Sequence, residues 1–228
     1  MDKDSFIDFM VRSGVIKFGS FKTKSGRMSP YFINMGSYCT GGQMQQLGMF
    51  YAGFIDELLK ASKLSDSDFI IFGPAYKGIP LAVASSVALM SGFGRDVSWC
   101  FNRKEKKDHG EGGSMVGCEL KDGDNVLILD DVLTAGTAVR ESLGILREQA
   151  DVKVTGVIVA VDRMERGRGG GSALSEISDE FGVNVFPMVN IREIVDSLYS
   201  RSSDGKPLID REIKTSIDAY LKEYGTYN

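Results

Sequence analysis

Two adjacent acids stand directly before a loop of small residues in the segment VLILDDVLTAGTAVRES, residues 126–142. Asp130 and Asp131 follow an apolar run, and a helical pattern begins at about Thr137. The backbone N–H groups at a helix start are unpaired and carry the positive end of the helix dipole, so they attract a phosphate. Two carboxylates would repel that phosphate unless they faced hydroxyl groups or a metal. A sugar phosphate presents both chemistries, and the segment predicts a site for such a ligand.

The small residues of the loop agree with this prediction. Ala135 and Gly136 let a phosphate approach the backbone, while Thr134 and Thr137 supply hydroxyl donors. A simpler alternative is that an acid or a threonine before the helix only caps its first turn. Capping explains a single residue more readily than two consecutive acids after a buried strand, because both carboxylates would lose hydration there.

The composition is that of a globular protein with a full core. The chain has 228 residues, 43% hydrophobic and 25% charged, which suits one large domain. Its net charge of −4 argues against a general nucleic-acid or membrane-surface binder. The three cysteines have no CxxC spacing, so neither a disulfide framework nor a zinc site is indicated. The N-terminus lacks the pattern of a signal peptide and no apolar run is long enough to span a membrane, so we expect a cytoplasmic protein.

Apolar runs alternate with helical patterns along most of the chain. Continuous apolar strands separated by helices predict an α/β fold with a mainly parallel sheet that helices cover on both faces. The segment 18–36 instead indicates irregular or hairpin structure, with a turn at Ser25–Gly26. We expect strands at 69–72, 97–101, 126–129, 154–161 and 183–189, and helices at 4–11, 42–61, 79–90, 137–149, 190–200 and 209–224.

Loops with unusual composition follow four of these strands. They span residues 73–78, 102–114, 130–138 and 162–171. Ligands of open parallel sheets collect at the carboxyl ends of the strands, so the four loops should meet at one edge. The loop 102–114 gathers an arginine, several lysines and the one histidine of the sequence before three glycines. Such a charge run is often only a solvated face, but its glycines would also allow the cations to fold over a diphosphate.

The acid pair and its loop resemble the phosphoribosyl-diphosphate motif of the type I phosphoribosyltransferases. The stretches FKTKSGRMSPYFIN, GPAYKG, FNRKEKKDHGEGG and DRMERGRGG surround it in the order found in the orotate phosphoribosyltransferases. The resemblance covers about residues 18–170. It implies the type I phosphoribosyltransferase fold in a single domain over 1–228. Within that domain it implies a small N-terminal hood over about 1–40, with a possible C-terminal contribution, a core over about 41–200 and a flexible lid over about 102–114.

The resemblance also implies roles for individual residues. Binding of 5-phospho-α-D-ribose 1-diphosphate (PRPP) is implied for Lys24, Tyr76, Lys77, Arg103, Lys104, Lys107 and His109, and for the loop Asp130, Asp131, Val132, Leu133, Thr134, Ala135, Gly136, Thr137 and Ala138. Contacts with orotate are implied for Phe32, Ile33, Thr134 and Arg163, partly through backbone groups at the first two. Catalytic roles are implied for Lys107, His109 and Asp131, and a non-proline cis peptide for Ala75–Tyr76. The planar guanidinium of Arg163 suits a carboxylate.

Two positions depart from the family pattern. Ile33 stands where the family often has a second Phe, which keeps an apolar wall without a second ring. Gly170 stands where the family often has Glu, and we assign no role to it.

The resemblance implies transfer of ribose 5-phosphate from PRPP to N1 of orotate, giving orotidine 5′-phosphate and diphosphate in pyrimidine biosynthesis. Mg²⁺ would be held mainly by the substrate, with Asp130 and Asp131 nearby, and no direct protein ligand is assigned to it. The family forms a homodimer in which the lid reaches the neighbouring active site. Within the lid, we favour an electrostatic role for Lys107 over strict acid catalysis by His109.

Two alternatives stay open at the level of sequence. The first is a phosphoribosyltransferase for another nucleobase, which an assay with orotate, uracil, adenine and hypoxanthine would distinguish. The second is a non-catalytic regulator that binds PRPP through the same acid-pair loop. Such a regulator could lack the lid cations and would usually carry a nucleic-acid-binding surface, whereas this chain has the cations and is acidic.

Overall fold

The centre of the fold is a six-stranded sheet in the order β5–β4–β3–β6–β7–β8. The computed structural model describes residues 1–23, 26–105, 114–199, 201–203 and 206–226. The strands are β3 (Ile70–Phe72), β4 (Ser98–Asn102), β5 (Met115–Gly117), β6 (Asn125–Leu133), β7 (Lys153–Asp162) and β8 (Val185–Asn190). All neighbours pair in parallel except β4 and β5, so the expected mainly parallel sheet is confirmed. The short antiparallel strand β5 was not expected, because its three residues are only partly buried or exposed and show no apolar run.

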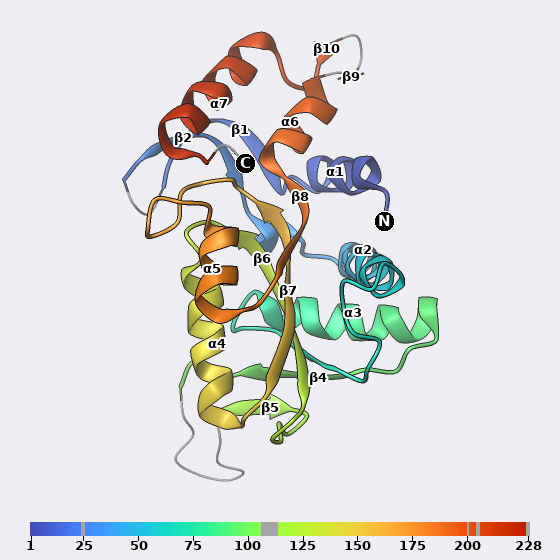
Figure 1. Ribbon diagram of the computed structural model, residues 1–228. Coiled ribbons are helices and arrows are strands. Elements are labelled where there is room, and N and C mark those ends of the chain that lie inside the picture. Colours follow the sequence, from blue (N-terminus) through green and yellow to red (C-terminus); the bar gives the residue numbers. More distant parts are fainter. Residues whose placement is uncertain (24–25, 106–113, 200, 204–205, 227–228) are drawn as a thin grey trace.

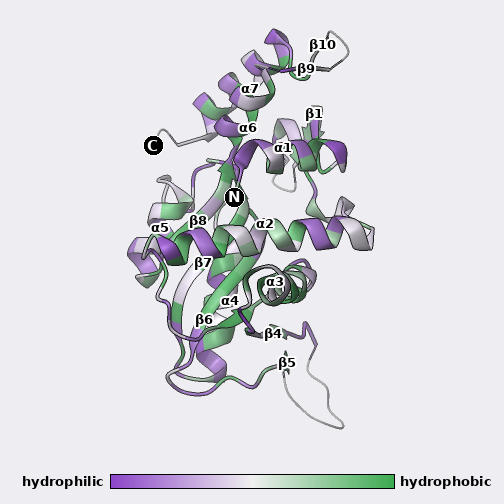
Figure 2. Ribbon diagram, turned by 90° about the vertical axis from the view of Figure 1, so that its right-hand side faces the viewer, coloured by the Kyte–Doolittle hydropathy of each residue, from purple (hydrophilic) through white to green (hydrophobic). Residues whose placement is uncertain are grey.

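Helices cover both faces of the sheet (Figure 1). Helices α2 (Gly41–Lys60) and α3 (Gly78–Phe93) lie on one face, and α4 (Thr137–Gln149) and α5 (Ala173–Phe181) lie on the other. Successive side chains of a strand point to opposite faces. Leu127 and Leu129 of β6 accordingly pack in the core under α2 and α3, while Val126 and Ile128 pack in the core under α4 and α5. Figure 2 shows hydrophobic residues on the central strands and on α3, and many hydrophilic residues on α1 and α7.

A second group of elements gathers at one end of the sheet (Figure 1). It contains α1 (Lys3–Arg12), the hairpin β1 (Ile16–Lys22) and β2 (Met28–Ile33), the 3-10 turn η1 (Met35–Ser37), α6 (Ile191–Tyr199), the short strands β9 (Ser202–Ser203) and β10 (Lys206–Pro207), and α7 (Arg211–Tyr224). The expected hairpin is confirmed; Gly26 of its turn has φ +83°, and Ser25 lies outside the described residues. The ion pair Lys3–Glu193 joins α1 to α6, so the two ends of the chain build this region together.

The expectation that the central strand stops before the acid pair is wrong. β6 continues to Leu133, which pairs with Asp162 of β7. The carboxylate of Asp130 accepts a hydrogen bond from the Asp131 N–H, and that of Asp131 accepts one from the Val132 N–H, both at 2.8 Å. The extended backbone therefore runs through the acids, and both carboxylates are held against the strand.

A membrane-spanning helix is not found in the part of the chain that the structure describes, since none of its helices is both long enough and apolar enough.

Candidate active site

The acid pair lies at the carboxyl edge of the sheet, almost out of water. Asp130 and Asp131 are each 7% exposed. Tyr51 of α2 donates its hydroxyl hydrogen to the carbonyl oxygen of Asp130 at 2.8 Å. Lys77, from the loop between β3 and α3, places its Nζ 2.6 Å from Oδ2 of Asp131. The structure thus brings together three residues that the sequence assigned to PRPP, and the cation neutralises one of the two carboxylates.

Burial makes two carboxyl groups at this edge difficult to ionise. Desolvation, and next the charge of Asp131, raise the pKa of Asp130 to about 7. Desolvation also raises the pKa of Asp162 to about 6, although the Met164 N–H donates to that carboxylate at 2.8 Å. A ligand that offers hydroxyl donors or a cation would replace the hydration that Asp130 has lost.

The candidate phosphate loop, residues 132–138, leads into α4 without a side-chain cap. Helix α4 begins at Thr137 with Gly136 as its N-cap residue, and no side-chain hydrogen bond caps it. The alternative that the acid pair only caps this helix is therefore wrong, because both carboxylates accept bonds from their own strand instead. Gly136 has φ +75°, and a Cβ there would lie 2.8 Å from Cδ1 of Ile177. The N–H groups of the first turn remain available to an anion.

One arginine fixes the phosphate loop from below. Arg140 donates from Nη1 to the Ala135 carbonyl at 2.9 Å. Its Nε donates to Glu180 at 2.7 Å, and its Nη2 donates to Glu176 at 3.3 Å. These contacts tie the loop conformation to α5, on the same face of the sheet.

Glu176 also organises the glycine-rich loop that follows β7. Its Oε1 accepts hydrogen bonds from the N–H groups of Gly169 at 2.9 Å and Gly171 at 3.1 Å. Arg168 belongs to the same glycine-rich loop. Its Nη2 donates to Oγ1 of Thr137, the first residue of α4, at 3.3 Å. Glu176 therefore supports both loops: it binds the glycine-rich loop directly and the phosphate loop through Arg140.

The loop 73–78 between β3 and α3, the candidate diphosphate site, is closely packed where it begins and ends and exposed at Tyr76. A Cβ on Gly73 would lie 2.1 Å from the carbonyl oxygen of Gly78, so the two loop ends touch. The Ala75 N–H donates to the side chain of Asn102 at 2.9 Å. The cis peptide expected at Ala75–Tyr76 is present, and the Tyr76 side chain is 69% exposed.

The candidate orotate residues come from two elements. Arg163 directly follows β7, is 7% exposed, and its N–H donates to the Leu133 carbonyl at 3.1 Å, beside Thr134. On β2, Ile33 is buried in the main core, whereas Phe32 is exposed on the opposite face of the strand. The structure therefore places the side chains of Phe32 and Ile33 on different faces.

Part of the predicted lid can be placed. Arg103 and Lys104 directly follow β4, and the Arg103 N–H donates to the Ser114 carbonyl at 2.6 Å, which holds the two ends of the lid segment together. Lys24, Lys107 and His109 lie outside the described residues. Their implied roles stay predictions.

Four residues that support this site were not predicted from the sequence: Tyr51, Arg140, Glu176 and Glu165, whose carboxylate accepts a hydrogen bond from Nε of Arg163 at 2.7 Å. Arg140 and Glu165 had local signals, since Arg140 lies in the first turn after the phosphate loop and Glu165 lies two residues after Arg163. Tyr51 has no local signal, because it is 79 residues from the acid whose carbonyl it contacts.

This fold and site define a class of enzymes that act on phosphorylated sugars, and comparison with known proteins agrees. Residues 43–184 match the sequence model of the phosphoribosyl transferase domain. The chain is 51% identical over 223 residues to the orotate phosphoribosyltransferase of Clostridium beijerinckii, covering 98% of this chain and 97% of that protein. It is 48% identical over 222 residues to the same enzyme of Bifidobacterium adolescentis, covering 96% of each.

A solved structure gives the same result. The crystal structure of orotate phosphoribosyltransferase from Francisella tularensis superposes on this structure with a TM-score of 0.79 at 35% identity. The match covers 97% of this chain and 100% of that one. The chain belongs to the orotate phosphoribosyltransferase family.

The first prediction concerns Asp130 and pH. Its pKa is raised in the folded state above its ordinary value of 3.8, so its contribution to stability is full below about pH 4 and is lost as pH rises through about 7. Asp130→Asn, which resembles the protonated form, should therefore raise Tm at pH 8 by about 3 °C or more, the order expected for about 1 kcal/mol, and have little effect at pH 4. Scanning calorimetry from pH 4 to 8 measures this difference. A shift that does not vary with pH, or one equally shown by the exposed Asp179→Asn, contradicts it.

The second prediction concerns Gly136. Gly136→Ala should lower the free energy of unfolding by at least about 1–2 kcal/mol, because the left-handed conformation disfavours a Cβ and that Cβ meets Ile177. Gly144→Ala is the matched control on the same helix, where nothing lies within 4 Å of the added atom. That change should raise stability by roughly 0.5–1 kcal/mol. Urea denaturation measures both, and equal effects would show that the phosphate loop does not require glycine.

Proposed function

We propose that this chain transfers ribose 5-phosphate from PRPP to N1 of orotate, releasing diphosphate and forming orotidine 5′-phosphate in pyrimidine biosynthesis. The observation that carries the proposal is the buried acid pair near the end of β6, a few residues before the start of α4, which no side chain caps. One site can thereby hold sugar hydroxyls and a phosphate a few residues apart. Membership of the orotate phosphoribosyltransferase family supports the choice of base.

The donor is bound at both of its ends. The N–H groups and hydroxyls of the loop 132–138 take the 5-phosphate, and the carboxylates of Asp130 and Asp131 take the ribose hydroxyls. Lys77, which pairs with Asp131 in the structure, turns to the diphosphate together with Tyr76. The ribose hydroxyls then supply the hydrogen bonds that Asp131 loses.

The reaction breaks the bond between ribose C1 and the diphosphate oxygen, and the diphosphate departs with the electron pair. The ribose ring gains positive charge, as in glycoside hydrolysis. N1 of orotate supplies the pair for the new bond and gives up its proton to the departing diphosphate. The carboxylate of Asp131 lies on the ribose side and favours this charge. Lys107 and His109 of the lid would bring cationic donors to the departing oxygens and exclude water, with Arg103 and Lys104 at the base of the lid.

The residues at this edge suit Mg²⁺ that the substrate carries. The phosphoribosyltransferase family generally uses Mg²⁺ with PRPP. In the described part of the chain, no three His, Cys, Asp or Glu side chains are grouped so that they could hold a metal. A pair of carboxylates fits Mg²⁺, which prefers one or two protein carboxylates beside water and substrate oxygens. When bound, the ion neutralises charge on the diphosphate.

An apolar surface supports the proposed homodimer. Met49 of α2 and Val87, Met90 and Phe93 of α3 are 40%, 64%, 54% and 38% exposed. A Cβ on Gly92 would lie 2.9 Å from Cε of Met49, so the two helices present these side chains side by side. Contiguous exposed apolar residues are typical of protein interfaces.

We propose that the hood consists of α1, β1 and β2 together with α6 and α7. We also propose that the reaction takes place in the cytoplasm.

The direct test of the function is an assay of the purified protein with PRPP and Mg²⁺. Orotate should be consumed, as followed by its ultraviolet absorbance, and uracil, adenine and hypoxanthine should react at least about 100-fold more slowly, because they lack the carboxylate for Arg163. Asp131→Asn and Lys107→Ala should each lower kcat by at least about tenfold, while Asp179→Asn should not change it. Faster turnover of another base, or PRPP binding without any turnover, would overturn the proposal.

The apolar surface gives a separate prediction. Met90→Asp should convert a homodimer to a monomer, because it buries an unpaired charge in the interface. Light scattering after size-exclusion chromatography measures the mass, with Met28→Asp, an exposed methionine on the hairpin, as the control. An unchanged dimer in Met90→Asp would exclude this surface as the interface.

A further inference from the structure

We propose that Glu165 is a positioning residue that orients Arg163 toward the carboxylate of orotate and ties that orientation to the hood. The proposal rests on the proposed function, since it names the residue behind the candidate orotate contact.

Glu165 is the buried centre of a cluster of donors. It is 4% exposed. Its Oε1 lies 2.7 Å from both Nε and Nη2 of Arg163 and accepts the hydroxyl hydrogen of Tyr220 at 2.9 Å. Its Oε2 accepts a hydrogen bond from Nη2 of Arg27 at 3.1 Å. Both oxygens are thus occupied by donors from three different parts of the fold.

The same contacts leave one end of the Arg163 guanidinium for a ligand. Its Cζ lies 4.3 Å from the centre of the Tyr31 ring, and its Nη2 donates to Oγ of Ser29 at 3.2 Å. Among the described residues, none accepts a hydrogen bond from Nη1. Because Nε and Nη2 are fixed by Glu165 and Ser29, the direction in which Nη1 points is fixed as well.

The local backbone is held in place for this purpose. Met164, between the two charged residues, has φ +55°, which a non-glycine side chain rarely adopts. Its N–H donates to the Asp162 carboxylate at 2.8 Å, and its carbonyl accepts from the Thr226 N–H at 2.9 Å. Strained backbone of this kind persists where the surroundings fix it and is frequent at functional sites.

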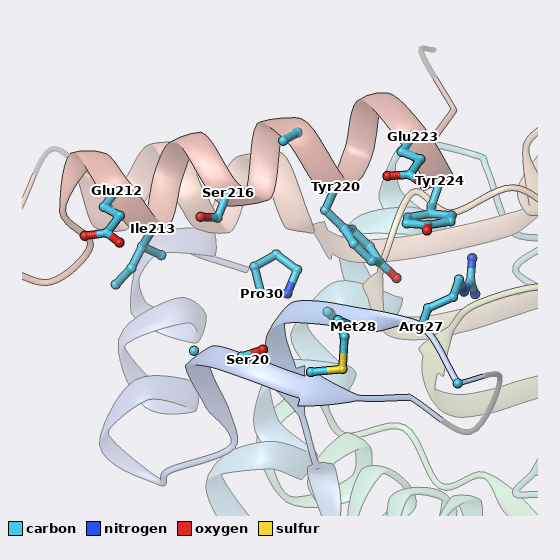
Figure 3. Close-up of a pocket in the computed structure, with 14 residues that line it drawn as sticks. Ser20, Arg27, Met28, Pro30, Glu212, Ile213, Ser216, Tyr220, Glu223 and Tyr224 are labelled. Atoms are coloured by element: carbon cyan, nitrogen blue, oxygen red, sulfur yellow. The ribbon is translucent and has the colours of Figure 1, made fainter.

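The other partners of Glu165 belong to the hood. Arg27 and Tyr220 lie together at one end of a cavity of about 720 Å³ between the β1–β2 hairpin and α7, as Figure 3 shows. The Arg27 guanidinium lies 5.1 Å from the centre of the Tyr224 ring. A shift of the hairpin against α7 would therefore alter the donors on Glu165 and, through it, the position of Arg163.

The test is Glu165→Gln, which keeps the size of the side chain and removes its charge. KM for orotate should rise at least about tenfold, while KM for PRPP stays within about twofold. Of the residues that contact Glu165, Arg163 alone is assigned to orotate and none is assigned to PRPP. Tyr220→Phe is the matched control, since it removes one donor from the same oxygen and leaves both Arg163 contacts. It should change KM for orotate by less than about threefold. A parallel rise in both KM values, as a purely structural role would give, overturns the proposal.

A double-mutant cycle tests whether Glu165 acts through Arg163. In the Arg163→Gln background, Glu165→Gln should raise KM for orotate by less than about twofold further. Independent losses that multiply would contradict the proposal.

A readout without substrate separates this proposal from the proposed function. The Nε–H resonance of Arg163 in ¹⁵N-labelled protein should be slow to exchange in the wild type and in Tyr220→Phe, and should be lost in Glu165→Gln. If the wild type failed to convert orotate, the proposed function would fall on that assay alone. An unchanged resonance in Glu165→Gln would show that Glu165 does not orient Arg163.

Discussion

Asp130 and Asp131 are held at the end of the central strand, where almost no water reaches their carboxylates. Two neighbouring buried carboxylates repel each other and lose hydration, so they require donors from the protein or a ligand. The protein supplies some of these from the following backbone N–H groups and from Lys77. These donors do not fully replace the lost hydration, and the pKa of Asp130 is raised to about 7 by burial and by the charge of Asp131. We propose that hydroxyl groups of a sugar meet the remaining need for donors and that the adjoining loop receives its phosphate.

The rest of the site depends on bringing separate loops to the same place. Parallel strands end at one edge of the sheet, so the loops after β3, β4, β6 and β7 meet there. Cross-contacts then fix each loop to another. Asn102 holds Ala75, and Arg163 binds the Leu133 carbonyl through its N–H. The β1–β2 hairpin and α7 join this arrangement through Arg27 and Tyr220, which both donate to Glu165.

Much of this was predictable from local pattern. Apolar runs separated by helical segments predicted the parallel sheet, because a strand buried on both faces is apolar throughout. The acid pair, the small-residue loop and the resemblance predicted the family. The end of β6 was predicted wrongly, because an acid pair is typical of the start of a loop. Here each carboxylate accepts a hydrogen bond from the next backbone N–H, and β6 extends to Leu133.

Other features arise only from the folded chain. The contact of Tyr51 with the Asp130 carbonyl joins residues far apart in sequence, and no local pattern indicates it. The role of Glu176 could not be predicted either, because this residue of α5 supports loops that lie elsewhere in the sequence. The side-chain directions of Phe32 and Ile33 follow from the register of the hairpin, which places Ile33 in the core and Phe32 on the opposite face. Motif spacing carries no information on that register.

The most direct test of the central claim is a crystal structure with PRPP bound. We expect the 5-phosphate against the backbone N–H groups at the start of α4, with the ribose hydroxyls on Asp130 and Asp131 and with Lys77 turned to the diphosphate. A donor lodged elsewhere, for example in the cavity between the hairpin and α7, while Lys77 still pairs with Asp131, would contradict it.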